Sequence, residues 1–268
     1  MISSKENYGD DIFSMINEKE EQRLKYLALS YDDFSKHHIE NLSLNKHPRC
    51  LDIGSGLGSI PVWLSSSRSI DAAEVVALDK DTTLIGKRLK SSNKIVIEKM
   101  DITDIEASCG QFDYIHTRFV MEHLTDRDKV IEKLITWLKP GGWLTTTSYH
   151  WDDSQIKEGA YKTVMNALFY TLNVRVGTDL QWIEEIGQSM KESGSCAFIK
   201  ERHNDVREII DPLCDFWVAT LESLKDFLMK NKNITEDIFH LAISEVRQSL
   251  LSYYQPCAVS ISVRPDPR

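Results

Sequence analysis

Three glycines and an aspartate form the part of this sequence whose chemistry is clearest. Gly54, Gly56 and Gly58 follow Asp52 in the segment LDIGSGLGS. Glycines at this spacing let the chain turn tightly with positive φ, and they let a ligand approach the backbone. A helix that begins just after them offers its first N–H groups to the ligand. The segment therefore predicts a binding site for a small ligand, and a glycine turn that serves packing alone is the alternative.

The identities of residues 52 and 59 separate two classes of ligand. A dinucleotide fingerprint has the pattern GxGxxG, and Ser59 stands where its third glycine would be. The Asp52 carboxylate suits a ligand with an ammonium or sulfonium charge, and it would repel a pyrophosphate. The segment therefore favours a positively charged ligand and disfavours a NAD-dependent oxidoreductase.

Two more aspartates follow the next two predicted strands. Asp79 ends an apolar run roughly 20 residues after the glycine turn, where a carboxylate can accept both hydroxyls of a ribose. Asp101 closes the third predicted strand, at the sheet edge where open α/β folds bind ligands. Asp79 therefore indicates an adenosine-type ligand, and Asp101 lies where such a ligand could be reached. The alternative for each is an ordinary surface loop aspartate.

These residues need a fold that brings strand ends together, and the hydrophobic pattern supplies one. Short apolar runs alternate with helical patterns from Pro48 to Ser148. Such alternation is typical of a parallel sheet with helices on both faces. The fold class is therefore α/β, with a doubly wound, mostly parallel seven-stranded sheet. The predicted strands cover residues 50–53, 75–78, 95–99, 112–116, 143–148, part of 197–207 and 258–263, and the helices between them cover 61–65, 83–90 and 126–138.

The chain is predicted to form one domain, 1–268, with three parts. Residues 1–47 hold one or two amphipathic helices, and residues 48–150 form a ligand-binding core. In residues 151–268 the helical patterns at 161–172 and 180–193 precede the sixth strand. Residues of about 211–250 add long helices before the last strand, and they form either a cap or an ordinary packing pair.

Composition limits the function further. The chain has 268 residues and a formal net charge of -9, which argues against binding DNA through its phosphates. Its five cysteines are scattered without a CxxC pair, as in a protein with free thiols in a reducing compartment. No stretch has the pattern of a signal peptide or a membrane span. We therefore expect a cytoplasmic protein that binds neither DNA nor a membrane, as a monomer or homodimer.

Five segments in a fixed order carry a resemblance to a known family. CLDIGSGLGSIPVWL, VVALDKD, EKMDITD, FDYIHTRFVMEHL and LKPGGWL together resemble the class I (Rossmann-like) S-adenosylmethionine-dependent methyltransferases of small molecules, most specifically over residues 49–148. The resemblance implies that S-adenosylmethionine is bound and S-adenosylhomocysteine released. The residues it assigns to the cofactor are Asp52, Gly54, Ser55, Gly56, Gly58, Asp79, Lys80, Asp101, Ile102, Thr117, Arg118 and Phe119. Arg118 is expected to turn its guanidinium toward a carboxylate, away from the sulfonium.

Methyl transfer needs mainly an aligned nucleophile, and a general base is optional. A base would lie at the carboxyl end of the fourth or fifth strand, where His150 is the first candidate and His123 the second. Tyr149 and Asp152 share that region. Substrate contacts are expected from aromatic residues, namely Tyr26, Tyr31, Tyr149 and Trp151, with His37, Tyr170 and Trp217 as further candidates. For each of them ordinary packing or loop hydrogen bonding is the alternative.

The sequence does not identify the molecule that accepts the methyl group, so several functions remain open. The sequence favours methyl transfer to O, N or C of a small organic metabolite, and it predicts no metal, because TRFVMEHLTDRD lacks a convincing Asp/Asn cluster. One alternative is a protein or RNA methyltransferase, which would need an open site. Another is a protein that binds adenosylmethionine without methylating anything.

Overall fold

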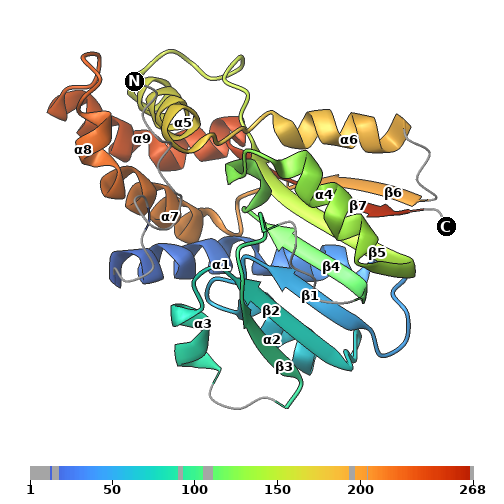
Figure 1. The fold of residues 1–268 in the computed structure, drawn as a ribbon. Coiled ribbons are helices and arrows are strands. Elements are labelled where there is room, and N and C mark those ends of the chain that lie inside the picture. The colour runs from blue at the N-terminus through green and yellow to red at the C-terminus, as the bar shows by residue number, and fades with distance from the viewer. Residues whose placement is uncertain are drawn as a thin grey trace.

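The sheet of this protein has the predicted architecture. The computed structural model describes residues 13, 18–89, 93–104, 111–192, 197–203 and 205–265. In this part of the chain seven strands form one sheet in the order β3-β2-β1-β4-β5-β7-β6 (Figure 1). Strand β7 runs antiparallel to β5 and β6, and the remaining pairs are parallel. The mostly parallel, doubly wound α/β fold is therefore confirmed.

The strand bounds differ from the predicted ones mainly in β4 and β5. The strands are β1 Arg49–Ile53, β2 Glu74–Asp79, β3 Ile95–Lys99, β4 Phe112–Arg118, β5 Leu138–His150, β6 Ala197–Arg202 and β7 Cys257–Arg264. Strand β5 includes the segment Pro140-Gly141-Gly142, which precedes the predicted strand 143–148. The pairing of β4 with β5 is irregular between Phe112 and Tyr114. A Cβ on Gly142 would lie 3.0 Å from the Lys139 carbonyl oxygen, so a glycine lets the backbone pack closely at this point inside β5.

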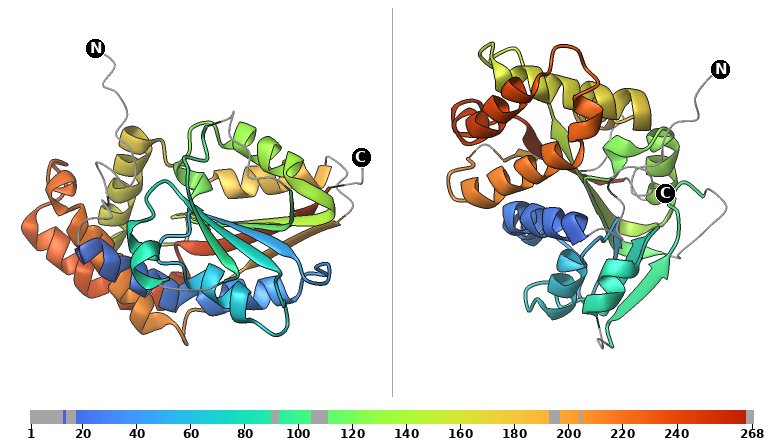
Figure 2. Two further views of the ribbon diagram at one scale, coloured as in Figure 1. Left: turned by 60° about the horizontal axis from the view of Figure 1, so that its bottom comes forward. Right: turned by 90° about the vertical axis from the view of Figure 1, so that its left-hand side faces the viewer.

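Helices cover both faces of the sheet (Figure 2). On one face, residues of α1 (Glu18–Glu40) and α2 (Ser59–Ser66) pack on Cys50, Val75 and Tyr114. On the other, α4 (Arg127–Thr136) and α6 (Trp182–Glu192) pack on apolar residues of β1, β2, β4 and β5. A short helix, α3 (Thr83–Arg88), follows β2. The alternation of strand side chains thus puts one apolar set on each face.

Four helices form a cap at one end of the sheet. Helix α5 (Ala160–Val176) follows β5, and α7 (Ile210–Ser223), α8 (Lys225–Leu228) and α9 (Glu236–Tyr253) lie between β6 and β7 in the chain. The helical insertion predicted before the last strand is therefore present. One apolar cluster joins these helices to Tyr31 of α1, Phe119 and Tyr149. Because this cluster is shared, the cap packs on the carboxyl ends of β4 and β5.

Candidate functional site

The glycine turn after β1 has the backbone geometry that its sequence predicts. Gly54, Gly56 and Gly58 have φ values of 69°, 51° and 75°, which side chains strongly disfavour. A Cβ on Gly54 would lie 2.2 Å from Val120 Cγ2, and one on Gly58 would lie 2.8 Å from Ile85 Cγ1. At these two positions glycine therefore meets a need for close packing as well as for positive φ.

Asp79 at the end of β2 connects the glycine turn to the next loop. Its Oδ2 accepts a hydrogen bond from the Gly56 N–H at 2.8 Å, and its Oδ1 accepts one from the Asp81 N–H at 3.0 Å. Burial raises the pKa of this carboxyl, and the two N–H donors oppose that rise. A carboxylate has about four acceptor positions, so two stay available for the hydroxyls of a ligand.

Replacing Asp79 by Asn is expected to weaken binding of an adenosine-containing cofactor by about 1–3 kcal/mol. The amide nitrogen cannot accept a hydrogen bond, so one of the two hydroxyl contacts or one backbone contact is lost. Titration calorimetry with S-adenosylhomocysteine measures the change. Affinity equal to that of the wild type would remove Asp79 from the binding site.

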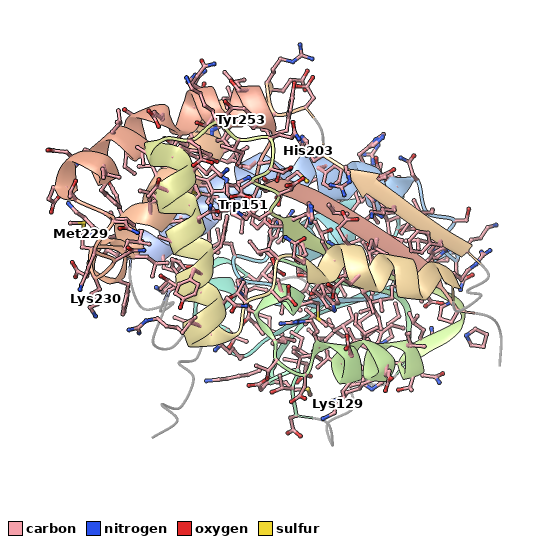
Figure 3. All side chains as sticks on the ribbon, turned by 90° about the horizontal axis from the view of Figure 1, so that it is seen from above. Lys129, Trp151, His203, Met229, Lys230 and Tyr253 are labelled. Atoms are coloured by element: carbon pink, nitrogen blue, oxygen red, sulfur yellow. The ribbon has the colours of Figure 1, made fainter. Side chains whose placement is uncertain are left out.

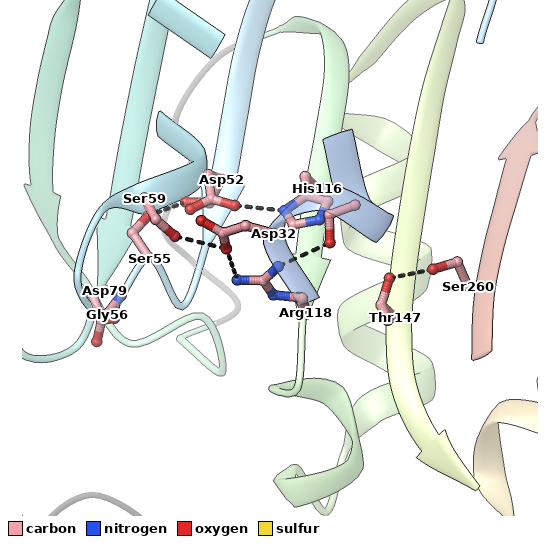
Figure 4. A network of polar contacts seen from close by, with 11 residues as sticks. Asp32, Asp52, Ser55, Gly56, Ser59, Asp79, His116, Arg118, Thr147 and Ser260 are labelled. Carbon is pink, nitrogen blue, oxygen red and sulfur yellow. Dashed lines mark hydrogen bonds and ion pairs between the residues drawn. The ribbon is translucent and has the colours of Figure 1, made fainter. Parts of the chain in front are cut away.

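Asp52 is held by a buried partner that the sequence did not reveal. His116 Nδ1 on β4 lies 2.6 Å from Asp52 Oδ1, and both side chains are almost fully buried (Figure 4). Their residues face each other in the pairing of β1 with β4. One carboxylate oxygen of Asp52 is therefore occupied by His116. Asp52 can act on a ligand only through its charge and its other oxygen.

The guanidinium of Arg118 binds a carboxylate of the N-terminal helix. Its Nη2 donates to Asp32 Oδ1 at 2.8 Å, and its Nη1 donates to Ser35 Oγ at 2.9 Å (Figure 4). The Ser59 hydroxyl, at the start of α2, donates to the same Asp32 oxygen at 3.0 Å. This network ties α1 to the end of β4 and to the helix after the glycine turn.

A cavity of about 480 Å³ opens at the carboxyl ends of the parallel strands. Eight of the residues assigned to the cofactor line it, namely Gly54, Gly56, Asp79, Lys80, Asp101, Ile102, Arg118 and Phe119. The other four do not, namely Asp52, Ser55, Gly58 and Thr117. Ser55 and Thr117 are buried, and the Ser55 hydroxyl donates to the Asp52 carbonyl. The cavity therefore brings the carboxyl ends of the first four strands to one place.

The cap and α1 form the opposite wall of the same cavity. Helix α5 contributes Phe169, Leu172 and Val176, and α7 contributes Phe216, Trp217 and Thr220. Helix α1 contributes Glu20, Arg23, Leu24 and Leu27. One cavity thus joins the predicted cofactor edge to an apolar, aromatic region that is suited to a second molecule.

The two candidate histidines lie in different places. His123 lines this cavity, and its Nδ1 lies 2.9 Å from Thr178 Oγ1. Burial lowers the pKa of His123 to about 3, with the charges of Arg23 and Arg127 acting in the same direction. His150 lines a separate polar cavity with Trp151, Asp152, Asp153, Asn166 and Gln181. The structure therefore separates the first candidate base from the cofactor-side residues.

The aromatic candidates for substrate contact are divided in the same way. Tyr149 and Trp217 line the main cavity, and Tyr149 stacks on Phe119 with ring centroids 4.1 Å apart. Tyr31 packs behind both rings and is buried, so it supports the wall without lining it. Trp151 lies beside α5, where its Nε1 donates to Asn166 Oδ1 (Figure 3).

Three other candidates lie outside both cavity linings. Tyr26 packs partly buried against the cap cluster. Tyr170 is 69% exposed on α5, and His37 contacts Asn41 near the end of α1. The expectation that these residues touch the substrate has no support from their positions.

Three charged residues of the main cavity, Glu20, Arg23 and Glu122, were not predicted as site residues from the sequence. Glu122, in the 3-10 turn η1 (Met121–His123), lines it and is fully buried. Glu20 and Arg23 form a buried ion pair with a 2.7 Å contact, and Arg23 lies over the rings of Phe13 and Phe216. Helical spacing shows that Glu20 and Arg23 can pair, but only the packed cap shows that they face a cavity.

The sheet order, the glycine turn and the strand-end aspartates define the class I methyltransferase fold. A family model described as "Methyltransferase domain" matches residues 20–201, which is more than half of the chain. The chain belongs to this methyltransferase family. Methyltransferases of this fold class use S-adenosylmethionine, so the predicted cofactor is confirmed.

Curated methyltransferases are similar to this chain at a moderate level of sequence identity. Phosphoethanolamine N-methyltransferase of Plasmodium falciparum is 25% identical over 209 residues, which are 77% of this chain and 72% of that protein. Phosphoethanolamine N-methyltransferase 1 of Zea mays is 25% identical over 67% of this chain, but the match spans only 34% of that protein. The chain thus corresponds to about a third of the plant enzyme.

Solved structures with the same fold belong to proteins that are named for different activities. Phosphoethanolamine N-methyltransferase 2 of Haemonchus contortus, in complex with S-adenosyl-L-methionine, has a TM-score of 0.57 and 18% identity. That match covers 92% of this chain and 53% of the other. The [4+2]-cyclase SpnF has a TM-score of 0.58 and 14% identity over 88% of this chain and 82% of its own. At these identities the likeness concerns the fold alone.

Proposed function

We propose that this protein transfers the methyl group of S-adenosylmethionine to a small organic acceptor bound in the main cavity. The observation that carries the proposal is the composition of that cavity. Its one wall holds the strand-end residues Asp79, Asp101 and Phe119, and its other wall holds aromatic residues of the cap. Two molecules can therefore lie side by side in one space, as methyl transfer requires.

The residues on the strand side suit each part of the cofactor. Asp79 has acceptor positions left for ribose hydroxyls, Asp101 lies beyond β3, and Ile102 is a buried apolar residue next to it. When bound, S-adenosylmethionine supplies a methyl group that its sulfonium makes electrophilic. The protein then has to orient the acceptor and exclude water.

A small acceptor fits this cavity better than a macromolecule. Residues of α1, α5 and α7 all line it, so the site lies beneath helices. A protein or RNA methyltransferase would present a broad open surface. That alternative predicts methylation of a peptide or RNA by the purified protein, with no turnover of small molecules.

Of the two candidate histidines, we expect only His123 to matter for turnover. His123→Ala is expected to reduce turnover at least about 10-fold, because a partly buried hydrogen-bonding group of the main cavity is lost. His150→Ala is the matched control, since His150 lies in another cavity. Steady-state rates at saturating cofactor give the comparison. A large effect of His150→Ala alone would contradict this assignment.

The names of the relatives suggest which acceptors to test first. Phosphoethanolamine is the acceptor in the name of the Plasmodium falciparum relative, and it is a small amine. Release of S-adenosylhomocysteine, measured over a panel of small amines, phenols and carboxylic acids, tests the proposal. Turnover of any of them supports it. Tight cofactor binding without release from any acceptor would instead favour a protein that binds adenosylmethionine without methylating.

The cellular setting is proposed from composition. Among the helices that the structure describes, none combines the length and the hydrophobicity of a membrane span. We propose a cytoplasmic protein that acts without DNA, on the basis of its net charge of -9 and its scattered cysteines.

A further inference from the structure

Glu122 is a buried carboxyl group without a partner beside the main cavity. Its exposed fraction is 0%, and neither Oε1 nor Oε2 has a hydrogen-bond partner among the described residues. The backbone N–H of Glu122 itself, the Ser148 hydroxyl, the Tyr149 N–H and the charge of Arg127 favour the charged form of the carboxyl, although none of these donors reaches hydrogen-bond geometry. Burial outweighs them and raises the pKa of Glu122 to about 7. A buried carboxylate of this kind is costly unless something pairs with it.

The positive groups around Glu122 already have carboxylate partners. Arg127, on α4, lies 3.0 Å from Asp179 Oδ2 and also donates to the carbonyl oxygens of Glu122 and Gly177. Arg23, on α1, is paired with Glu20. His123 is neutral, because its pKa is lowered to about 3. The charge of a deprotonated Glu122 is therefore left for a cation from outside the chain.

The neighbouring wall is aromatic and holds two more polar atoms without partners. Tyr149 Oη and Trp217 Nε1 are buried and have no hydrogen-bond partner in the described part of the chain. Both residues line the cavity with Glu122, and their rings lie 5.1 Å apart. The Trp217 ring also lies 6.0 Å from that of Phe169. Aromatic rings next to a carboxylate are the surroundings that an ammonium group prefers.

We propose that Glu122 binds the ammonium group of the acceptor and takes its proton, so that the acceptor of this enzyme is a small cationic amine. The nitrogen lone pair freed in this way forms the bond to the methyl carbon as the carbon–sulfur bond breaks, and S-adenosylhomocysteine leaves. The amine lies between the Glu122 carboxylate and the rings of Tyr149 and Trp217. A hydrogen-bond acceptor next to the amine, such as a hydroxyl or another oxygen, meets the Trp217 N–H. This assignment rests on the proposed methyl transfer and narrows its substrates from organic acceptors to amines.

A pair of isosteric probes tests the charge preference directly. N,N-dimethylethanolamine is cationic near neutral pH, and 3-methylbutan-1-ol has the same shape with CH in place of the protonated nitrogen. Titration calorimetry of the full chain, saturated with S-adenosylhomocysteine at a pH about one unit above the pKa of Glu122, gives both affinities. The wild type is expected to bind the amine at least about 10-fold more tightly than the alcohol.

Glu122→Gln keeps the shape of the side chain and removes its charge. It is expected to lower affinity for the amine roughly 10- to 100-fold and to change affinity for the alcohol by no more than about 2-fold. Glu132→Gln, at an exposed position of α4 outside the cavity lining, removes the same net charge and is expected to change neither. Equal effects of the two variants would overturn the assignment, since only general electrostatics would then be at work.

The outcomes also separate this assignment from the proposed function. If the wild type binds S-adenosylhomocysteine but binds the amine no better than the alcohol, or not at all, Glu122 does not select amines and methyl transfer is untouched. If it binds no S-adenosylhomocysteine, the proposed function itself fails. Normal cofactor affinity in Glu122→Gln shows that the variant has folded.

Discussion

The wild-type protein is expected to lose about 3 kcal/mol of folding free energy, relative to Glu122→Gln, as the pH rises from about 4.5 to about 7. Burial raises the pKa of Glu122 from 4.5 to about 7, so the folded state holds a proton that the unfolded state releases in this interval. The carboxyl therefore costs nothing below the lower pKa, and its full cost is present above the upper one. Glutamine does not ionise and has no such cost.

Urea unfolding of both proteins at a series of pH values measures this difference. Comparing the two removes the contributions of all other titrating groups, provided that they are unchanged by the substitution. Glu132→Gln serves as the control for an exposed carboxyl, and its stability should follow that of the wild type. Parallel curves for wild type and Glu122→Gln across the interval would show that Glu122 has an ordinary pKa.

Gly54→Ala is expected to destabilise the protein by about 2–5 kcal/mol and to abolish cofactor binding at ordinary concentrations. Two costs add. A residue with a Cβ pays about 1–2 kcal/mol to adopt the left-handed φ of 69°. The new Cβ would also lie 2.2 Å from Val120 Cγ2, so the turn or Val120 has to move.

A double substitution separates the two costs. Gly54→Ala with Val120→Ala removes the clash but keeps the strained φ, so it should recover only the packing part, after allowing for the effect of Val120→Ala alone. Gly86→Ala is the control, because Gly86 lies in α3 and a Cβ there meets no atom within 4 Å. Chemical denaturation gives the free energies of unfolding. Equal stability of Gly54→Ala and Gly86→Ala would contradict the geometry of the turn.

The sheet could be predicted because its signals are local. Each strand from β1 to β5 is a short apolar run between helix or turn residues, and the glycine turn and Asp79 sit at strand ends that the pattern itself marks. The limits of β4 and β5 were less clear, since they depend on the irregular pairing near Phe112.

Parts of the site could not be predicted because they depend on long-range contacts. His150 was preferred as a base because it ends β5, but successive strand residues face opposite sides. Tyr149 therefore lines the main cavity and His150 another one. The pairing of Asp52 with His116 depends on the register of β1 and β4. Glu122 has no local signal at all, because its burial comes from its packing beside β5.

Binding of the cofactor tests the central claim most directly. Titration calorimetry of the full chain is carried out separately with S-adenosylmethionine, S-adenosylhomocysteine and NAD. It shows which of these adenosine-containing ligands the site at the glycine turn binds. We predict that both sulfur-containing ligands bind at one per chain, that Asp79→Asn weakens both, and that NAD gives no heat of binding. Binding of NAD with none of S-adenosylmethionine would contradict the assignment of this protein as a methyltransferase.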